Sequence, residues 1–495
     1  MIAHRLAALV LFLAGAAAAA GPLSPAEREL MEAIGANTLR GHLSFLASDL
    51  LEGRDTPSRG LDLAAEYIAS QFRRFGLEPA GDQGTYFQNA PYVKVTQPMD
   101  GFHLRIETGD GKSWESSGAK LIALTGAPVN LSGLEVVKVT LSSATAPLPP
   151  VGDVRGKAVL LYVAQGLAPA VARNRILTTL RPALLVTYGI FPPAPFRLRP
   201  AGPNSPPPAP TVITSDGEFS RLLDTLPDGA TTARLTARIS GPREEPLALR
   251  NVIARLPGSD PVLRNEAILL TAHYDHVGVS GRGDGDRIHN GANDDASGVA
   301  TVLALAEALA ARRLRPRRTL LFMTYFGEEK GLLGSRYYAA HPVHPLRDTV
   351  ANLNFEHMGR TDDNEGPRLN QVTGTGLAFT TLGEALAATG GATGVTMWTH
   401  PRNTEEFFAR SDNQALADAG VPAMTVCVAW IFPDYHRPSD HWERIDLPNM
   451  ERVVRAMGVA VTRIANSDTA PRWIESHPKV KPYLEAFKKL HPAGA

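Results

Sequence analysis

Four runs of apolar residues in the second half of the chain are typical of buried β-strands. They cover residues 266–272, 318–326, 350–356 and 421–428, and a helical pattern at 297–313 separates the first two. Uninterrupted apolar strands that alternate with helices indicate a sheet covered on both faces and largely parallel. We therefore predict an α/β fold in which a mostly parallel twisted sheet carries helices on both faces.

Histidines and carboxylates gather where these strands end. They are His273, Asp275, His276, Asp294, Asp295, Glu328, Glu329, Glu356, His357, His436, Asp440 and His441, with Tyr435 among them. Ligands of such sheets bind beyond the carboxyl ends of the strands. So many acidic side chains at one edge would repel one another unless cations lay between them. A mixture of imidazole and carboxylate favours zinc, whereas calcium and magnesium prefer oxygen ligands alone.

Two metal ions fit this set of side chains better than one. If one carboxylate bridges two ions, each ion needs one histidine and one further carboxylate. The adjacent residues Glu328 and Glu329 follow the 318–326 strand, and neighbouring residues at a strand end point in different directions. One glutamate can therefore hold an ion, while the other acts as general base toward a water molecule.

Five motifs carry a family resemblance. HYDH, GANDDASG, FGEEKGLLGS, NLNFEHMG and YHRPSDHWERID occur in this order. They resemble the motifs of the co-catalytic two-zinc aminopeptidase family, which includes leucyl-type aminopeptidases, glutamate carboxypeptidase-like peptidases and glutaminyl cyclase relatives. The resemblance covers most of residues 40–95 and 248–466. It implies a zinc-exopeptidase-like fold, two Zn²⁺ ions as cofactors and peptides with a free N-terminus as substrates.

The resemblance also implies which residues bind the two ions. The first zinc would be held by His273 and Glu356, and the second by Glu329 and His436. Asp294 would bridge both ions.

Three further residues receive catalytic or supporting roles from the same resemblance. Glu328 would be the general base, Asp275 would orient the histidine of the first zinc from behind, and Tyr435 would stabilise the oxyanion. A cis peptide bond is expected between Asp294 and Asp295, as in relatives.

The remaining polar residues near the motifs are expected in lesser roles. Asp440 would support the imidazole of His436. Ser411 and Asp412 would link parts of the site, whereas Cys427 would be inert core. The other histidines, which we expect beside the site or in its wall and not as ligands, are His276, His289, His357 and His441.

The predicted function is that of a zinc-dependent aminopeptidase. The sequence has no GxSxG or HExxH motif, which disfavours serine hydrolases and thermolysin-like enzymes. Glu356 stands where aminopeptidases of the resembling family commonly have aspartate, and the cyclase branch often has glutamate there. A glutaminyl cyclase or carboxypeptidase on the same scaffold, and a non-catalytic binding protein, therefore remain alternatives.

The pattern of expected strands, helices and turns divides the chain into parts. Residues 25–95 and 246–467 are expected to form a discontinuous catalytic domain. Residues 96–245 contain short alternating strands and frequent turns, and they predict an inserted β-rich domain resembling protease-associated domains. Residues 468–495 are expected to form a C-terminal tail with one short helix.

The N-terminus is typical of a signal peptide. A short apolar run follows the first arginine and ends in small residues, so cleavage is expected after residue 20 and the protein would be exported to the periplasm or secreted. No later segment looks apolar enough to span a membrane. The formal net charge is zero, which does not favour a nucleic-acid partner. A single cysteine excludes an internal disulfide, and the oligomeric state stays open.

Overall fold

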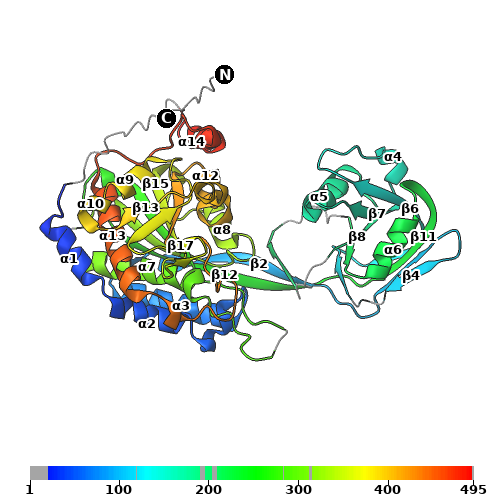
Figure 1. Ribbon diagram of the computed structural model, residues 1–495, viewed down its shortest axis with the longest axis horizontal. Coiled ribbons are helices and arrows are strands. Elements are labelled where there is room, and N and C mark those ends of the chain that lie inside the picture. The colour runs from blue at the N-terminus through cyan, green and yellow to red at the C-terminus, as the bar shows by residue number, and fades with distance from the viewer. Residues whose placement is uncertain are drawn as a thin grey trace, which may run out of the picture. The chain divides into compact units, whose positions relative to one another are not determined.

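The computed structural model describes residues 21–492, except for residues 117, 119, 190–195, 203–208, 282–283 and 312–314. The expected signal peptide lies outside the described residues. The chain divides into two compact units, of which the first joins Met1–Ala90 to Leu249–Ala495 and the second is Pro91–Ala248 (Figure 1). The two boundaries fall inside strands β2 (Phe87–Thr96) and β12 (Arg243–Leu256), close to the boundaries expected at 95 and 246.

The first unit is organised by a sheet of ten strands, of which β9 belongs by sequence to the second unit. Its order is β19-β18-β20-β15-β13-β14-β12-β2-β9, and β1 also pairs with β12. The bounds of the strands not yet given are β1 Glu78–Pro79, β9 Arg197–Pro200, β13 Ala267–His273, β14 Thr319–Tyr325, β15 Thr349–Phe355, β18 Gln371–Gly374, β19 Thr396–Met397 and β20 Ala423–Cys427. The predicted α/β class is confirmed, and the four apolar runs form the four central strands.

The parallel part of this sheet is its centre. β13 pairs in parallel with both β14 and β15, and β15 pairs in parallel with β20. All seven residues of β13 are buried, which explains its uninterrupted apolar sequence. The flanking strands β12 and β18 pair antiparallel with β14 and β20. Their pairings are long-range and leave no distinct pattern in the sequence, so the prediction of a mostly parallel sheet describes the centre and the edge pair of β18 and β19.

Helices cover both faces of the central strands (Figure 1). α7 contacts β13, β14 and β15 and is itself covered by α1, α2, α3 and α13, whereas α8 and α12 lie against β14, β15 and β20. The bounds are α1 Pro25–Ala33, α2 Ala36–Leu46, α3 Arg59–Arg74, α7 Ser297–Ala310, α8 Leu333–Ala340, α9 Thr381–Ala387, α10 Gly390–Thr393, α11 Asn403–Glu406, α12 Asn413–Asp418, α13 Leu447–Asn466 and α14 Lys481–Leu490. α14 corresponds to the helix expected in the tail.

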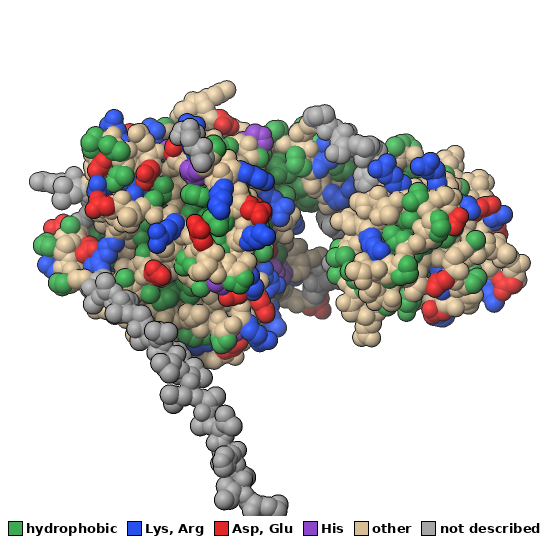
Figure 2. Space-filling model, turned by 90° about the horizontal axis from the view of Figure 1, so that it is seen from above, with side chains coloured by type: hydrophobic (Ala, Val, Ile, Leu, Met, Phe, Trp, Pro, Cys, Tyr) green, Lys and Arg blue, Asp and Glu red, His purple; other side chains and the backbone are tan. Residues whose placement is uncertain are grey.

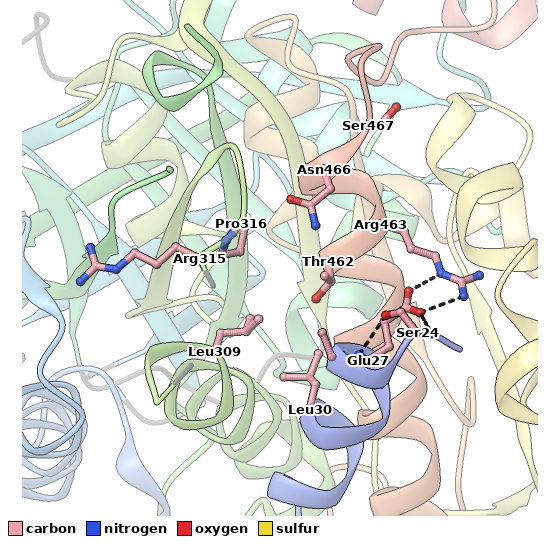
Figure 3. Close-up of a pocket in the computed structure, with 11 residues that line it drawn as sticks. Ser24, Glu27, Leu30, Leu309, Arg315, Pro316, Thr462, Arg463, Asn466 and Ser467 are labelled. Carbon is pink, nitrogen blue, oxygen red and sulfur yellow. Dashed lines mark hydrogen bonds and ion pairs between the residues drawn. The ribbon is translucent and has the colours of Figure 1, made fainter. Parts of the chain in front are cut away.

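The N-terminal helix α1 begins with a capping box and is linked to α13 by an ion pair. The Ser24 hydroxyl accepts a hydrogen bond from the backbone of Glu27, and the Glu27 carboxylate accepts one from the backbone of Ser24. The same carboxylate lies 2.6 Å from Nε of Arg463 on α13, and this arginine lowers the pKa of Glu27. Figure 3 shows these side chains at one side of a pocket that Leu30 and Leu309 also line. This contact joins the first residues after the expected cleavage point to the body of the first unit.

The second unit has its own eight-stranded sheet and two apolar cores. The strand order is β4-β3-β11-β6-β7-β8-β10-β5, with β6, β7, β8 and β10 parallel to one another. Its elements are β3 His103–Glu107, β4 Ser113–Ser116, β5 Leu121–Leu124, β6 Val129–Leu141, α4 Val151–Val154, β7 Ala158–Val163, α5 Pro169–Thr179, β8 Leu184–Tyr188, β10 Thr211–Thr214, α6 Gly217–Thr225 and β11 Gly229–Ile239. The unit is rich in strands but also carries three helices among its described residues.

The surface shows no large region of one charge on the face drawn in Figure 2, where lysines and arginines lie among aspartates and glutamates. Among the described residues, none of the helices combines the length and the apolar character that crossing a membrane requires.

Candidate metal centre

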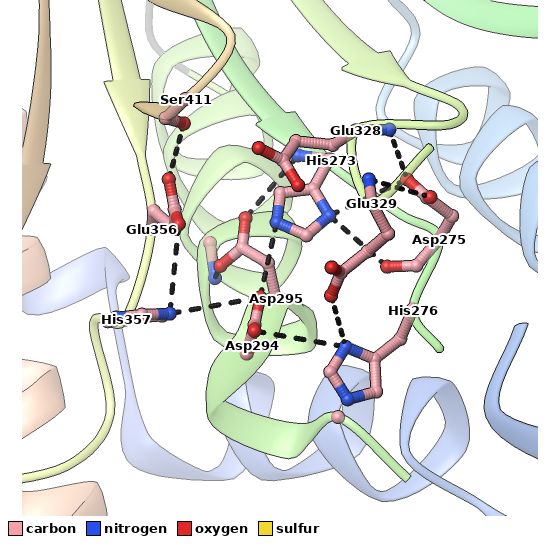
Figure 4. Close-up of polar contacts among 12 residues, drawn as sticks. His273, Asp275, His276, Asp294, Asp295, Glu328, Glu329, Glu356, His357 and Ser411 are labelled. Atoms are coloured by element: carbon pink, nitrogen blue, oxygen red, sulfur yellow. Dashed lines mark hydrogen bonds and ion pairs between the residues drawn. The ribbon is translucent and has the colours of Figure 1, made fainter. Parts of the chain in front are cut away.

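The carboxyl ends of the central strands bring the predicted residues together (Figure 4). His273 is the last residue of β13, and Asp294 lies in the turn Ala292–Ala296 that precedes α7. Glu328 and Glu329 follow β14, and Glu356 follows β15. Because β13 lies between β14 and β15, the side chains that follow these strands converge on one point.

His273, Asp294 and Glu356 form the first group of possible metal ligands. Each offers one ligand atom, and these atoms lie within 4.8 Å of one another. His273 Nε2 is 3.3 Å from Asp294 Oδ1. This group coincides with the set predicted for the first zinc.

A second group shares Asp294 with the first. It also contains Glu329 and His436, the residues predicted for the second zinc, and His276, which was not expected as a ligand. His436 Nε2 lies 3.1 Å from Asp294 Oδ2 and 3.2 Å from Glu329 Oε1. Since Asp294 directs one oxygen toward each group, it stands where a bridging carboxylate is needed.

Unsatisfied buried atoms show that both groups fit metal ions. Among the described side chains, these buried atoms of the site lack a hydrogen-bond partner: His273 Nε2, both ring nitrogens of His276, Glu329 Oε1, His357 Nε2 and His436 Nε2. Buried polar atoms are rarely left without partners. Imidazole nitrogens and carboxylate oxygens are the donors that zinc prefers, so zinc would satisfy the atoms that the protein leaves unpaired.

The charges in the metal-free protein support the same conclusion. Burial opposes ionisation of Asp294, but the nearby imidazoles of His273, His357 and His436 outweigh it and lower the pKa of Asp294 well below its usual range. Burial also opposes protonation of His436, yet Asp294 and Glu329 raise its pKa to about 10. Protonated histidines therefore neutralise the carboxylates when metal is absent, and metal binding must displace those protons.

Glu328 differs from its neighbour in its electrostatic environment. Burial raises the pKa of Glu328 well above the usual range, and Glu356, Asp412 and Glu329 add to this effect. Glu328 belongs to neither ligand group. Figure 4 shows the two glutamates leaving the same turn with their side chains diverging. A carboxylate that is near the ligands, outside both groups and easily protonated suits a general base.

Asp275 acts mainly on backbone atoms. Its carboxylate accepts hydrogen bonds from the amides of Glu328 at 3.0 Å and Glu329 at 3.3 Å. The ring of His273 was expected to be its partner, but His273 Nδ1 lies 3.6 Å from that carboxylate and 3.2 Å from the Asp275 carbonyl oxygen. Asp275 thus fixes the glutamate turn as well as the histidine.

Asp440 has a similar role on the other side of the site. It accepts hydrogen bonds from the backbone amides of Asn293, at 2.9 Å, and Asp294, at 3.2 Å. Asp440 was expected to support the imidazole of His436. Its carboxylate instead contacts the turn that carries Asp294, the ligand that the two groups share. The cis peptide bond expected between Asp294 and Asp295 is present.

A hydrogen-bond network positions Glu356. Ser411 donates a hydrogen bond to Glu356 Oε2 and accepts one from the side-chain amide of Asn354 at 2.9 Å. The neighbouring Asp412 accepts a hydrogen bond from Ser335 at 2.5 Å, and burial raises the pKa of Asp412 to about 7. The expected link through Ser411 and Asp412 is therefore present.

Arg54 is a structural residue that the sequence did not reveal. Its side chain is 1% exposed and donates hydrogen bonds to four backbone carbonyls, those of Leu46, Tyr274, Asn290 and Gly291. Burial lowers its pKa to about 10, although nearby aspartates of the site favour its charge. Its position after the helical region at the N-terminus gave no sign of a contact more than 200 residues away.

Tyr435 lies at the edge of a pocket beside Glu356. Its ring stacks on His436 with centroids 4.0 Å apart, and 40% of the residue is exposed. Burial and the surrounding carboxylates raise the pKa of its hydroxyl, which therefore stays a hydrogen-bond donor at neutral pH. The pocket is also lined by Phe407, Arg410 and Trp430.

Comparisons with known proteins agree with this geometry. Residues 251–461 match the model of peptidase family M28. A probable zinc metalloprotease of Leptosphaeria maculans is 36% identical over 123 residues, which are 25% of this chain and 27% of the relative. A vacuolar membrane protease of Lachancea thermotolerans is 38% identical over 103 residues, which are 21% of this chain and 9% of the relative. The matches thus span about a quarter or less of these curated relatives.

Solved structures share the fold over most of the chain. The aminopeptidase from Aneurinibacillus sp. strain AM-1 has a TM-score of 0.61 at 21% identity, covering 90% of this chain and 97% of that protein. BSAP, a zinc aminopeptidase from Bacillus subtilis, has a TM-score of 0.51 at 18% identity, with 86% and 94% covered. Residues 251–461, which carry the ordered motifs and both ligand groups, are therefore similar to peptidase family M28.

Proposed function

We propose that this chain is a zinc-dependent aminopeptidase that removes N-terminal residues from peptides. The observation that carries the proposal is the pair of ligand groups that share Asp294 while Glu328 lies outside both. The printed names of structural neighbours support it, since they describe a zinc aminopeptidase and an aminopeptidase.

Two zinc ions would be held by the residues already described. His273, Asp294 and Glu356 would hold the first, and Asp294, Glu329 and His436 the second. When bound, the ions supply Lewis-acid chemistry that lowers the pKa of water and polarises a carbonyl group.

The protein's own residues then move the protons. Glu328 accepts the proton of the attacking water and afterwards delivers it to the leaving amine. Burial raises the pKa of Glu328 well above the usual range of a glutamate, so its carboxylate accepts a proton more readily than an exposed one does. The neutral hydroxyl of Tyr435 would donate a hydrogen bond to the substrate's carbonyl oxygen as negative charge develops on it.

The pocket beside Glu356 would receive the first side chain of the peptide. Its wall combines the aromatic rings of Phe407 and Trp430 with Ile431, and the guanidinium of Arg410 lies 4.6 Å from the centroid of the Phe407 ring. An apolar wall next to the ligand groups favours large apolar or aromatic N-terminal residues. The free α-amino group of the substrate would be attracted by the carboxylates that surround the ligands.

One set of assays tests the proposal. Purified mature protein is offered aminoacyl 4-nitroanilides, N-acetylated peptides and peptides with N-terminal glutamine, each with and without a chelator. Chelator-sensitive release from free-amine substrates alone is the expected result. Cyclisation of the glutaminyl peptide without release would instead support a glutaminyl cyclase, to which Glu356 draws attention. Inactivity on all three substrates would favour a carboxypeptidase or a binding protein.

We also propose that the protein is exported after removal of residues 1–20. The apolar run and the small residues before Gly21 support this proposal. N-terminal sequencing of the protein from its native host would give Gly21 as the first residue, whereas an intact Met1 in a cytoplasmic fraction would contradict it.

A further inference from the structure

His276 occupies a position inside the second ligand group. Its Nδ1 lies 2.9 Å from Glu329 Oε1 and 3.9 Å from Asp294 Oδ2. The residue is completely buried, and neither ring nitrogen has a hydrogen-bond partner. This short contact is an ion-pair distance and not a hydrogen bond, and it is a distance that two ligands of one ion can have. Figure 4 shows the ring directed at Glu329 and Asp294.

The surrounding chain holds this ring in place. Gly291 lies against it, because a Cβ atom added to Gly291 would be 2.5 Å from His276 Cγ. His436 meets the same ring edge-on with centroids 5.4 Å apart. The backbone amide of His276 donates to the Arg54 carbonyl oxygen at 3.2 Å. A buried imidazole that is fixed on several sides, lies beside two carboxylates and lacks hydrogen-bond partners is prepared for a cation.

We propose that His276 is a fourth protein ligand of the second zinc. This inference rests on the zinc centre of the proposed function and goes beyond it, since the second ion would then be enclosed by His276, Asp294, Glu329 and His436. The first ion would have three protein ligands, His273, Asp294 and Glu356. Zinc enclosed by four protein groups is typical of closed sites, whereas three groups leave a position open for water or substrate.

The two sites therefore differ in how firmly they hold their ion. The second site retains its zinc and keeps the shared carboxylate in position. The first site exchanges its zinc more readily and offers the open position to the substrate.

The zinc content of two variants tests this assignment. Wild type, His276→Ala and His289→Ala are loaded with zinc and dialysed against a weak chelator, and zinc per chain and the rate of release are measured. His289 is the matched control, because its ring lies 6.5 Å from that of His276 and its Nε2 contacts Ser280 at 2.7 Å. Thermal unfolding followed by circular dichroism shows whether each variant is folded.

Wild type and His289→Ala are expected to retain one ion after the other has left. Loss of a residue that merely supports a ligand lowers metal affinity by about 10- to 100-fold, so loss of a ligand should cost at least that much. His276→Ala is therefore expected to release its last ion at least about tenfold faster. Release from His276→Ala at the wild-type rate would overturn the proposal.

A second measurement needs no variant. X-ray absorption of wild type loaded with one zinc per chain counts the imidazoles bound to that ion. Two imidazoles are expected, from His276 and His436, whereas one would overturn the assignment. Peptide hydrolysis is scored separately, so an inactive protein that binds zinc through two imidazoles contradicts the proposed aminopeptidase and still supports this ligand set. A wild type that binds no zinc overturns both.

Discussion

The carboxylate of Asp275 accepts a hydrogen bond from the backbone amide of Glu328 at 3.0 Å, across 53 residues of sequence. This contact connects the end of β13 to the turn after β14. It places the general base predicted for the reaction relative to the histidine of the first ligand group. The carboxylate that was expected to orient one ring therefore also determines where the base lies.

Replacement of Asp275 tests this connection. Asp275→Ala is expected to lower kcat/KM by about 10- to 100-fold or more, because both the turn and His273 lose their support. Asp275→Asn keeps one acceptor and should lose less. Steady-state kinetics and zinc content report the two effects, and Asp286→Asn, which changes an exposed acid nearby, is the control. Equal activity of Asp275→Ala and wild type would contradict the role.

Replacement of the two adjacent glutamates, one at a time, should have different effects on catalysis and on zinc binding. Glu328→Gln is expected to bind zinc normally and to lose about 10²- to 10⁴-fold in kcat, since only proton transfer is removed. Glu329→Gln should lose zinc from the second site, because a ligand is removed. Zinc analysis beside kcat measurements distinguishes them, and the reverse assignment of the two effects would refute the proposed roles.

Zinc binding is expected to strengthen as the pH rises. Asp294 and Glu329 raise the pKa of His436 to about 10 against the effect of burial in the metal-free protein, so this ligand is protonated at neutral pH. Zinc needs the neutral ring. At any pH below the pKa of His436, a rise in pH therefore favours zinc binding. Competition titrations between pH 6 and pH 9 measure the affinity. An affinity that does not change over this range would contradict the prediction.

Arg54 should be important for stability. Arg54→Ala leaves four buried carbonyl oxygens without their donor and removes a buried positive charge beside the aspartates of the site. Loss of one partner from a buried charged network costs about 3 to 5 kcal/mol in the free energy of unfolding. Denaturant unfolding of the zinc-bound protein measures this cost. Arg59→Ala, at a position exposed on the surface, is the control, and a similar small loss in both variants would refute the role.

The aromatic wall beside Glu356 should determine which N-terminal residue is preferred. Trp430→Ala removes a nearly buried ring from that wall. It is expected to raise KM for large apolar or aromatic aminoacyl substrates, with a smaller effect on alanyl substrates, because only large side chains fill the pocket. Kinetics with a series of 4-nitroanilides show the difference, and an equal change for every substrate would argue against a specificity pocket.

The ligand set was accessible from sequence because it follows strands. Each apolar run ends at the same edge of the sheet, so the residue types that come next can be expected to meet. His273, Glu329 and Glu356 could be assigned in this way with the help of the family resemblance. His276 could not, since it lies three residues beyond the end of β13, where the alternation of side chains along a strand no longer applies.

The sequence by itself determined the α/β class and the four central strands. It also determined the two ligand groups that share Asp294, apart from His276, and the cis peptide bond between Asp294 and Asp295. These features depend on local patterns of apolar and polar residues and on ordered motifs. Only the tertiary structure decided the antiparallel flanks of the sheet, the burial of Arg54, and the hydrogen bonds that Asp275 and Asp440 accept from distant backbone amides. The physical reason is that these contacts join residues 53 to more than 200 positions apart through backbone atoms, which every residue carries and no sequence pattern marks.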